Sequence, residues 1–165
     1  MYTDSYIKNR WNLLLNRVNN GVGNSYRDTK ICEEWLDFNN FKSWFIENSY
    51  AGKQFKLEID KDLFGNGDKL YSPETCCLLP KSLNILLSSC TSRNEFLPGV
   101  SLTKSGKYQV SSTRNCTVIK KVFDTQEEAF EEFKRFKKES ILIAAEAYKF
   151  LLPDRIYKAL IEFDF

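Results

Sequence analysis

The chain has 165 residues, which suits one domain or two small ones, and its 42% hydrophobic and 15% aromatic content excludes a disordered chain. Its formal net charge is only +2, so a nucleic-acid-binding surface requires the positive charge to be concentrated on one face. The sequence contains no histidine, which removes the most common general base at neutral pH and the most common metal ligand.

Cysteine usage and hydropathy predict the compartment. The five cysteines include no C-x-x-C pair, so the spacing favours neither a zinc site nor a disulfide framework. We expect reduced and mostly buried thiols, as in a cytoplasmic protein. No apolar run reaches the roughly 20 residues of a membrane span, and the charged N-terminal segment is not typical of a signal peptide. The predicted location is therefore the cytoplasm, without membrane association.

The first half of the chain predicts helices followed by short strands. Apolar residues at helical spacing indicate amphipathic helices over residues 6–18 and 38–48, and their aromatic side chains are expected in the core. Residues 55–71 predict a strand, a Gly-Asn-Gly turn and a second strand. A further short strand is expected over residues 76–79 and a short helix over residues 81–88.

The second half of the chain predicts a sheet followed by a long helix. Over residues 99–136, alternating apolar and polar residues give way to helical periodicity. Thr125 and Glu128 form a T-x-x-E capping box at the expected start of this helix. Pro153 ends the helix or restarts it, and residues 154–164 predict a final short helix. Its apolar side requires a partner, which is either the preceding helix or a second copy of the chain in a homodimer.

These elements predict an α+β protein with two units. Residues 1–90 form a helical and ββα-finger-like region, and the polar segment 91–98 is the predicted linker. Residues 99–165 form a three-stranded antiparallel sheet packed on a long helix, with a short C-terminal helix.

One motif has the layout of a small metal finger. A strand with Asp60, the turn Ser72-Pro73-Glu74, a short strand and a helix with Asn84 resemble the ββα-metal finger of HNH homing endonucleases. The resemblance implies that Asp60 and Asn84 hold one divalent ion such as Mg²⁺. Lys61 stands where that family has its general-base histidine, and Thr75 stands where it has a loop asparagine. No cofactor is expected unless the finger still holds Mg²⁺.

This degenerate pattern bears on enzymatic activity. An ammonium group at the position of Lys61 does not accept a proton from water in the way that histidine does. We therefore expect nuclease activity to be lost. The remaining alternative is a Mg²⁺-dependent HNH-type DNA endonuclease. Without a metal, the segment Asp60-Lys61-Asp62 is a charged strand end that faces solvent or DNA.

The second unit resembles a DNA-binding domain. Gly99-Val100, Gly106-Lys107-Tyr108 and Phe123-Asp124-Thr125 follow the order of the small domain of plant ethylene-response factors, and nearly the whole chain resembles small phage proteins that combine it with an HNH-like region. The resemblance implies a sheet that lies in the major groove. Ser101 and Thr103 stand where the plant domains carry arginines. The remaining expected DNA contacts are Lys104, Lys107, Gln109, Arg114, Lys120 and Lys121.

Two functions from different classes follow from these observations. The first is a phage-type protein that binds double-stranded DNA and derives from an HNH homing endonuclease without retaining nuclease activity. The alternative is a phage inhibitor that binds a host protein such as a defence nuclease, in an anti-CRISPR or other anti-defence role. The near-zero net charge and the missing base-reading arginines favour this alternative. A solvated basic face without a ligand also remains open.

Overall fold

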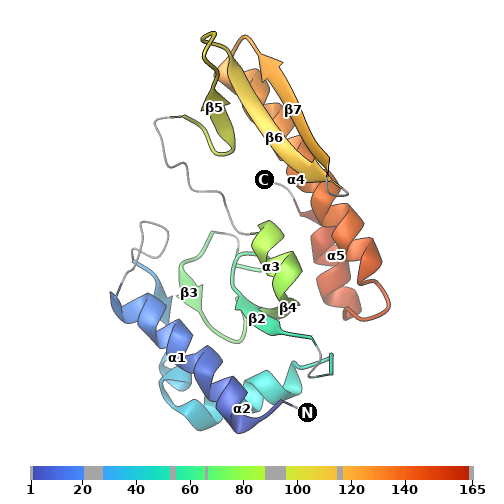
Figure 1. Cartoon of the computed structure of the whole chain (residues 1–165). Coiled ribbons are helices and arrows are strands. Elements are labelled where there is room, and N and C mark those ends of the chain that lie inside the picture. The colour runs from blue at the N-terminus through green and yellow to red at the C-terminus, as the bar shows by residue number, and fades with distance from the viewer. Residues whose placement is uncertain are drawn as a thin grey trace.

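The computed structural model describes residues 2–20, 28–52, 55–65, 67–87, 96–114 and 117–163. In these ranges the protein is a mixed α+β structure with three small sheets, which confirms the predicted class. Figure 1 shows the N-terminal helices at one end of the molecule and the three-stranded sheet with its helix at the other. Most of the predicted linker lies outside the described residues, so the boundary at 91–98 stays a prediction.

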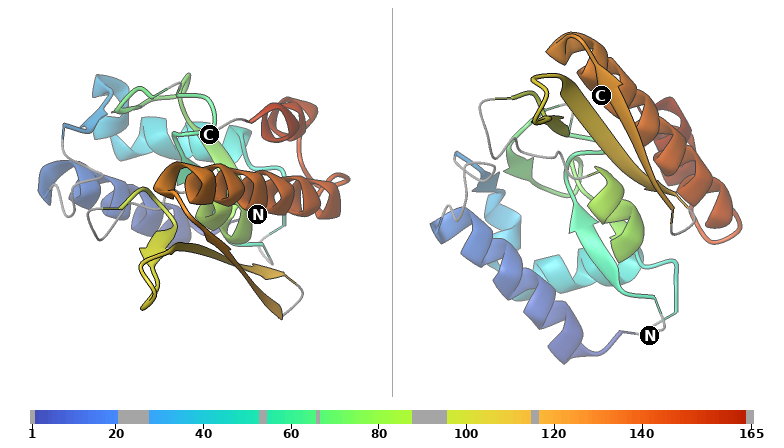
Figure 2. Two further views of the ribbon diagram at one scale, coloured as in Figure 1. Left: turned by 90° about the horizontal axis from the view of Figure 1, so that it is seen from above. Right: turned by 45° about the horizontal axis from the view of Figure 1, so that its top comes forward.

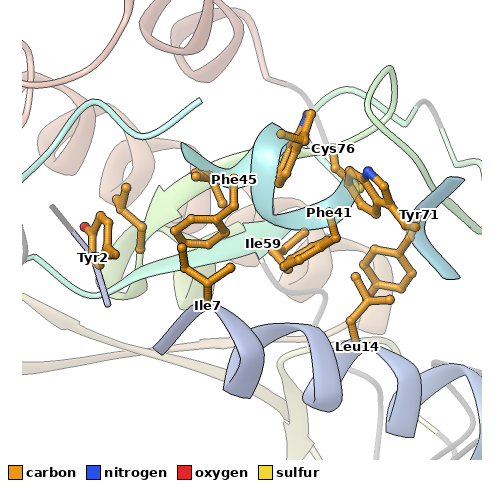
Figure 3. Close-up of a cluster of buried hydrophobic side chains, with 12 residues drawn as sticks. Tyr2, Ile7, Leu14, Phe41, Phe45, Ile59, Tyr71 and Cys76 are labelled. Atoms are coloured by element: carbon orange, nitrogen blue, oxygen red, sulfur yellow. The ribbon is translucent and has the colours of Figure 1, made fainter. Parts of the chain in front are cut away.

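The N-terminal region is built around aromatic side chains. Helix α1 (Asp4–Asn20) packs on α2 (Phe38–Glu47), which follows the short 3-10 helix η2 (Glu33–Leu36), and both predicted α-helices are confirmed. Asp37 caps α2 by accepting a hydrogen bond from the N–H of Asn39 at 2.7 Å. Ile7, Leu14, Phe41, Phe45, Ile59 and Tyr71 are among the buried residues of this first core, which Figure 3 shows between α1 and α2.

The strands of the first half do not pair in the order in which they follow one another. Strand β2 (Leu57–Asp60) pairs antiparallel with β4 (Cys77–Pro80), whereas β3 (Leu70–Tyr71) pairs parallel with β1 (Lys30–Ile31). The predicted strands over 55–71 therefore exist, but they are not partners. All four residues of β4 are buried, and this run offers β2 more apolar surface than the two residues of β3 do.

Helix α3 (Lys81–Leu87) follows β4 without an intervening loop and packs on both strands of the β2–β4 pair. Strands β2 and β4 and helix α3 thus form a ββα arrangement, in which β4 takes the place of the second strand. Leu83 and Leu87 of this helix are buried in the core that α3 shares with β4.

The three-stranded antiparallel sheet of the second half is confirmed. Its strands are β5 (Val100–Leu102), β6 (Tyr108–Arg114) and β7 (Thr117–Phe123), with β6 in the centre. Helix α4 (Gln126–Ala147) covers one side of the sheet, as both views in Figure 2 show. The predicted capping box at its start is also present, because Thr125 and Glu128 exchange side-chain hydrogen bonds with each other's backbone N–H.

Helix α4 extends beyond the sheet into a core that it shares with the first half. Ile141 and Ala145 are buried there beside Leu79 and Leu83. Helix α5 (Asp154–Glu162) returns along α4, and its buried residues belong to the same core. The expected packing of the last helix on the preceding one is confirmed. Self-association through α5 stays a prediction.

Two glycines of the sheet unit adopt a left-handed backbone, and they offer a matched pair for a stability experiment. Gly99 has φ +74°, and a Cβ built on it would lie 2.1 Å from the Phe133 ring. Gly106 has φ +79°, but nothing lies within 4 Å of the equivalent Cβ.

We expect Gly106→Ala to lower the free energy of unfolding by about 1 kcal/mol, the cost of a left-handed alanine. Gly99→Ala should add a further cost of about 1–3 kcal/mol because Phe133 must move. Urea denaturation followed by circular dichroism measures both values. Equal losses would contradict the close packing of Gly99 against α4.

Candidate nucleic-acid interface

The sheet β5–β6–β7 has one side against α4 and one side open. Val110 is fully buried under α4, and its cross-strand partner Lys121 therefore lies on the same, helix-facing side. Because side chains alternate along a strand, Gln109 and its partner Val122 lie on the opposite side. We call that side the outer sheet face. Its described members are Ser101, Gln109, Ser111, Val118, Lys120 and Val122.

The structure separates the six residues predicted to contact DNA. Gln109 and Lys120 lie on the outer sheet face, and Lys107 extends the same row at the start of β6. Lys104 is exposed in the turn between β5 and β6. Lys121 lies on the helix-facing side. The sixth residue, Arg114, ends β6, and its side chain lies outside the described part of the chain.

The outer sheet face carries hydroxyl, amide and methyl groups and the cation Lys120, with Lys107 at its edge. Strands β5, β6 and β7 contain no acidic residue. The nearest carboxylate in sequence belongs to Asp124, which forms an ion pair of 2.7 Å with the ammonium group of Lys107. The hydrogen bond to Asp124 raises the pKa of Lys107 from its ordinary value. Both partners are exposed, so this ion pair contributes little to stability and can exchange for a phosphate.

Lys121 has a structural role that the sequence did not indicate. Its ammonium group lies 2.7 Å from Glu132 of α4 and 5.7 Å from the centre of the Phe136 ring. Arg135 binds the same carboxylate, and its hydrogen bond is the main cause that lowers the pKa of Glu132 to about 2. This group of charges ties β7 to α4. Lys121 is therefore engaged within the protein, and its neighbour Lys120 points to the opposite side of the strand.

Two exposed valines belong to the same outer face, and the sequence analysis did not include them. Val118 and Val122 flank Lys120 along β7, and both are about half exposed. Because side chains alternate along a strand, every second residue of β7 counted from Lys120 lies on the same side, and this rule would have identified both valines. Methyl groups on a sheet face can contact the C5-methyl group of thymine. Their exposure also makes this face suitable for a protein partner.

In the finger-like region, Asp60 supports the turn that follows β2. Its Oδ1 accepts hydrogen bonds from the backbone N–H of Leu63 at 2.8 Å and of Asp62 at 3.1 Å. The side chain is buried opposite Cys77 of β4. Burial raises the pKa of Asp60 to about 6, and the backbone hydrogen bond from Leu63 partly opposes this shift. The carboxylate is thus part of the interior and does not form a solvated strand end.

Asn84 makes a different contact from Asp60. Its amide donates to Glu58 of β2 at 3.2 Å, and Glu58 also accepts from Arg10 of α1 at 3.3 Å. This polar chain joins α1, β2 and α3. The hydrogen bonds of Asp60 and Asn84 therefore direct the two side chains toward different partners rather than toward a common ion. Within the described residues, no group of three or more His, Cys, Asp and Glu side chains could hold a metal ion.

The other two finger positions also have local partners. Lys61 forms an ion pair of 2.5 Å with Asp62. Thr75 donates to the carbonyl of Leu70 at 2.6 Å and accepts from the N–H of Ser72 at 3.1 Å, which closes the turn between β3 and β4. Lys61 thus presents a hydrogen-bond donor, and the hydroxyl group of Thr75 holds a turn.

Comparison with known proteins does not assign the chain to a family. No protein family, no curated protein and no solved structure matches the chain. Among the helices in the described ranges, none combines the length and the apolar character required to cross a bilayer.

The buried carboxylate of Asp60 predicts an unusual dependence of stability on pH. Because its pKa is about 6 in the fold against an ordinary value of 3.8, the ionised form is disfavoured in the native state. The stability associated with Asp60 is complete below pH 4 and is lost as the pH rises to about 6. An asparagine side chain at this position could accept the same two backbone hydrogen bonds without a charge.

We therefore expect Asp60→Asn to raise the free energy of unfolding at pH 7.5 by up to about 3 kcal/mol and to have little effect near pH 4. Urea denaturation of both proteins across this pH range measures the difference. Asp62→Asn, which changes an exposed neighbour, should show a much smaller rise, because the charge of Asp62 is only a secondary cause of the raised pKa of Asp60. If the free energies of unfolding of the wild type and Asp60→Asn differ by the same amount at every pH, the raised pKa of Asp60 is contradicted.

Proposed function

We propose that the protein binds double-stranded DNA through the outer sheet face. The observation that supports this most is the composition of the side of the sheet that α4 leaves open, where the strands carry Lys120 and hydroxyl groups but no carboxylate. Electrostatic attraction to phosphates gives most of the affinity of such a surface, and hydroxyl groups add hydrogen bonds to the backbone. The overall charge of +2 does not oppose this because the charge is unevenly distributed.

The dimensions of the sheet are compatible with the major groove. The groove of B-DNA is about 12 Å wide and admits a two-stranded ribbon. Strands β6 and β7 form such a ribbon over seven paired positions, while β5 is only three residues long. In the proposed complex, Gln109 and the two exposed valines approach base edges. Lys107 and Lys120 reach phosphates at the margins.

The proposed activity is binding without strand cleavage. In the HNH-like pattern the residue at the position of Lys61 would have to take a proton from water. The ammonium group of Lys61 is instead paired with Asp62 at 2.5 Å and can only donate. The ββα region then contributes to the scaffold through its buried contacts.

The double substitution of Lys107 and Lys120 by glutamate tests the interface. We expect weaker binding to duplex DNA at low salt, because two attractive interactions with phosphates become repulsive. The slope of log affinity against log salt concentration should become shallower by about 0.9 for each phosphate that the variant no longer binds. Fluorescence anisotropy with a labelled duplex at several salt concentrations measures both quantities.

Lys158→Glu is a control for each of the two charge reversals, since it makes one such reversal at an exposed position of α5. It should leave the salt slope close to that of the wild type. If the double variant binds as tightly as the wild type and with the same slope, the outer sheet face is not the DNA-binding surface.

A second candidate function, binding to a host protein, is favoured by a separate apolar site. Phe150 is fully exposed just after α4, and Ile143, seven residues earlier on α4, is half exposed. Aromatic side chains that protrude in this way are common anchors of protein interfaces. This site is distinct from the outer sheet face, so the two functions can be separated by mutation.

If this candidate is right, a host protein should co-purify with the wild type from nuclease-treated lysate and be absent with Phe150→Ser. Leu36→Ser, which removes another exposed apolar side chain on η2, should retain it. Mass spectrometry of the retained proteins gives the measurement. If both variants retain the host protein, Phe150 is not the anchor. The same conclusion follows if no host protein is retained by the wild type or by either variant.

A further inference from the structure

Helix α1 presents a line of exposed asparagines outside the three hydrophobic cores. Asn9, Asn12 and Asn16 are all exposed and follow the helical spacing of three and four residues. They lie opposite the buried residues Ile7 and Leu14. We call this line the asparagine ridge. The asparagines at positions 19 and 20 are left out of it because asparagine is common at helix ends.

The asparagine ridge is unfavourable for the helix itself. Asparagine is a poor helix former, and each one in an exposed position costs up to about 0.7 kcal/mol relative to alanine. Among the described residues, none of the three asparagines belongs to a hydrophobic core. Asn9 makes a local contact, since its side chain accepts a hydrogen bond from Arg10 at 2.9 Å. Propensity and packing therefore do not explain why asparagine occupies these positions.

The surroundings of the ridge are complementary to a polyanion. At 100° per residue, Lys8 and Arg17 fall on opposite sides of the line of asparagines. Helix α1 has three cations, of which Arg10 pairs with Glu58 of β2, and a single carboxylate, Asp4. Asp4 lies at the first residue and forms an ion pair of 2.5 Å with Lys42 of α2. From residue 5 to residue 20 the helix has no acidic side chain.

We propose that α1 enters the major groove of duplex DNA and that the asparagine ridge reads adenines there. The asparagine amide matches adenine, because it accepts from N6 and donates to N7 in one bidentate contact. A helix of about 10–12 Å diameter fits the groove. Asn9 and Asn16 are about 10 Å apart along the axis, which corresponds to about three base pairs. Lys8 and Arg17 then face the phosphates on the two sides of the groove.

The position of α1 in the molecule is consistent with a second contact on the same DNA. In Figure 1, α1 lies in front of α2, and strands β6 and β7 lie in front of α4. The view from above in Figure 2 agrees, with α1 and the sheet both on the side that faces the viewer in Figure 1. This inference rests on the proposed DNA-binding function. It adds adenine reading by α1 to the base and phosphate contacts that the proposed function gives to the outer sheet face.

The double variant Asn12→Ala with Asn16→Ala tests the inference. Both substitutions favour the helix, so unfolding cannot explain a loss of binding. A pool of duplexes with a randomised centre is selected on the wild-type chain, and we expect enrichment of adenine at neighbouring positions. Replacing one enriched A·T pair by G·C should weaken the wild type roughly tenfold. The double variant should bind the two duplexes equally.

Two controls separate this inference from the proposed function. Asn39→Ala, an exposed asparagine of α2, should keep the preference for adenine. The variant with glutamate at 107 and 120 should lose affinity but keep that preference. If the variant with glutamate at 107 and 120 keeps the affinity of the wild type, the sheet is not the phosphate-binding face. The inference on α1 then still stands.

A double variant that selects the same motif as the wild type would overturn the base-reading role of the ridge. A wild-type chain that binds no duplex would overturn both proposals. It would assign the ridge to a protein partner instead.

Discussion

The burial of α4 at both of its ends is the constraint on which the rest of the structure depends. Its first half packs under the sheet with Phe133 and Phe136, and its second half packs with Ile141 and Ala145 against α3 and β4. One continuous helix therefore belongs to two cores. Because helices resist bending, the orientation of the sheet relative to the N-terminal region follows from α4. The side of the sheet that stays open is determined in the same way.

The same helix explains how a chain of low net charge can carry a cationic surface. Glu131, Glu132 and Glu139 all lie on α4 and pair with cations of α4 or with Lys121. These carboxylates of α4 thus lie on the helix layer, whereas Asp124, paired with Lys107, lies at the edge of the outer sheet face. Strands with no acidic residue remain on the other layer. Net charge sums the whole chain, including the ion pairs of α4, and for that reason it is a poor guide to binding here.

The sequence predicted the elements well because most of their signals are local. Helical spacing in α1 and α2 and the capping box at Thr125 depend only on neighbouring residues. Strand pairing depends on distant residues, so the partner of β2 was not predicted from the segment 55–71. Lys120 and Lys121 show the same limit. Adjacent lysines point to opposite sides of a strand, and only the register with Val110 shows which of them meets α4.

The candidate site was predictable in part for a related reason. The cations of the sheet are visible in the sequence, whereas the interior position of Asp60 depends on its pairing opposite Cys77. A charged Asp-Lys-Asp segment is usually solvated, and nothing local shows that its first carboxylate is buried. The spacing of the asparagine ridge on α1 is local and visible in principle. The apolar side of that helix gives the stronger signal, however, and it predicts packing rather than binding.

Base contacts on α1, added to those of the sheet, would have consequences for selectivity. Phosphate contacts position a protein on any duplex, whereas base contacts distinguish one sequence from another. Non-specific affinity grows with the number of cations that meet the backbone, and non-specific sites compete with the target throughout a genome. A chain that presents few cations to the DNA backbone, as proposed for Lys107 and Lys120, binds these competing sites weakly. In the proposed arrangement each amide contact on α1 then adds to the ratio of specific to non-specific binding, so a net charge of +2 is compatible with a selective DNA-binding protein.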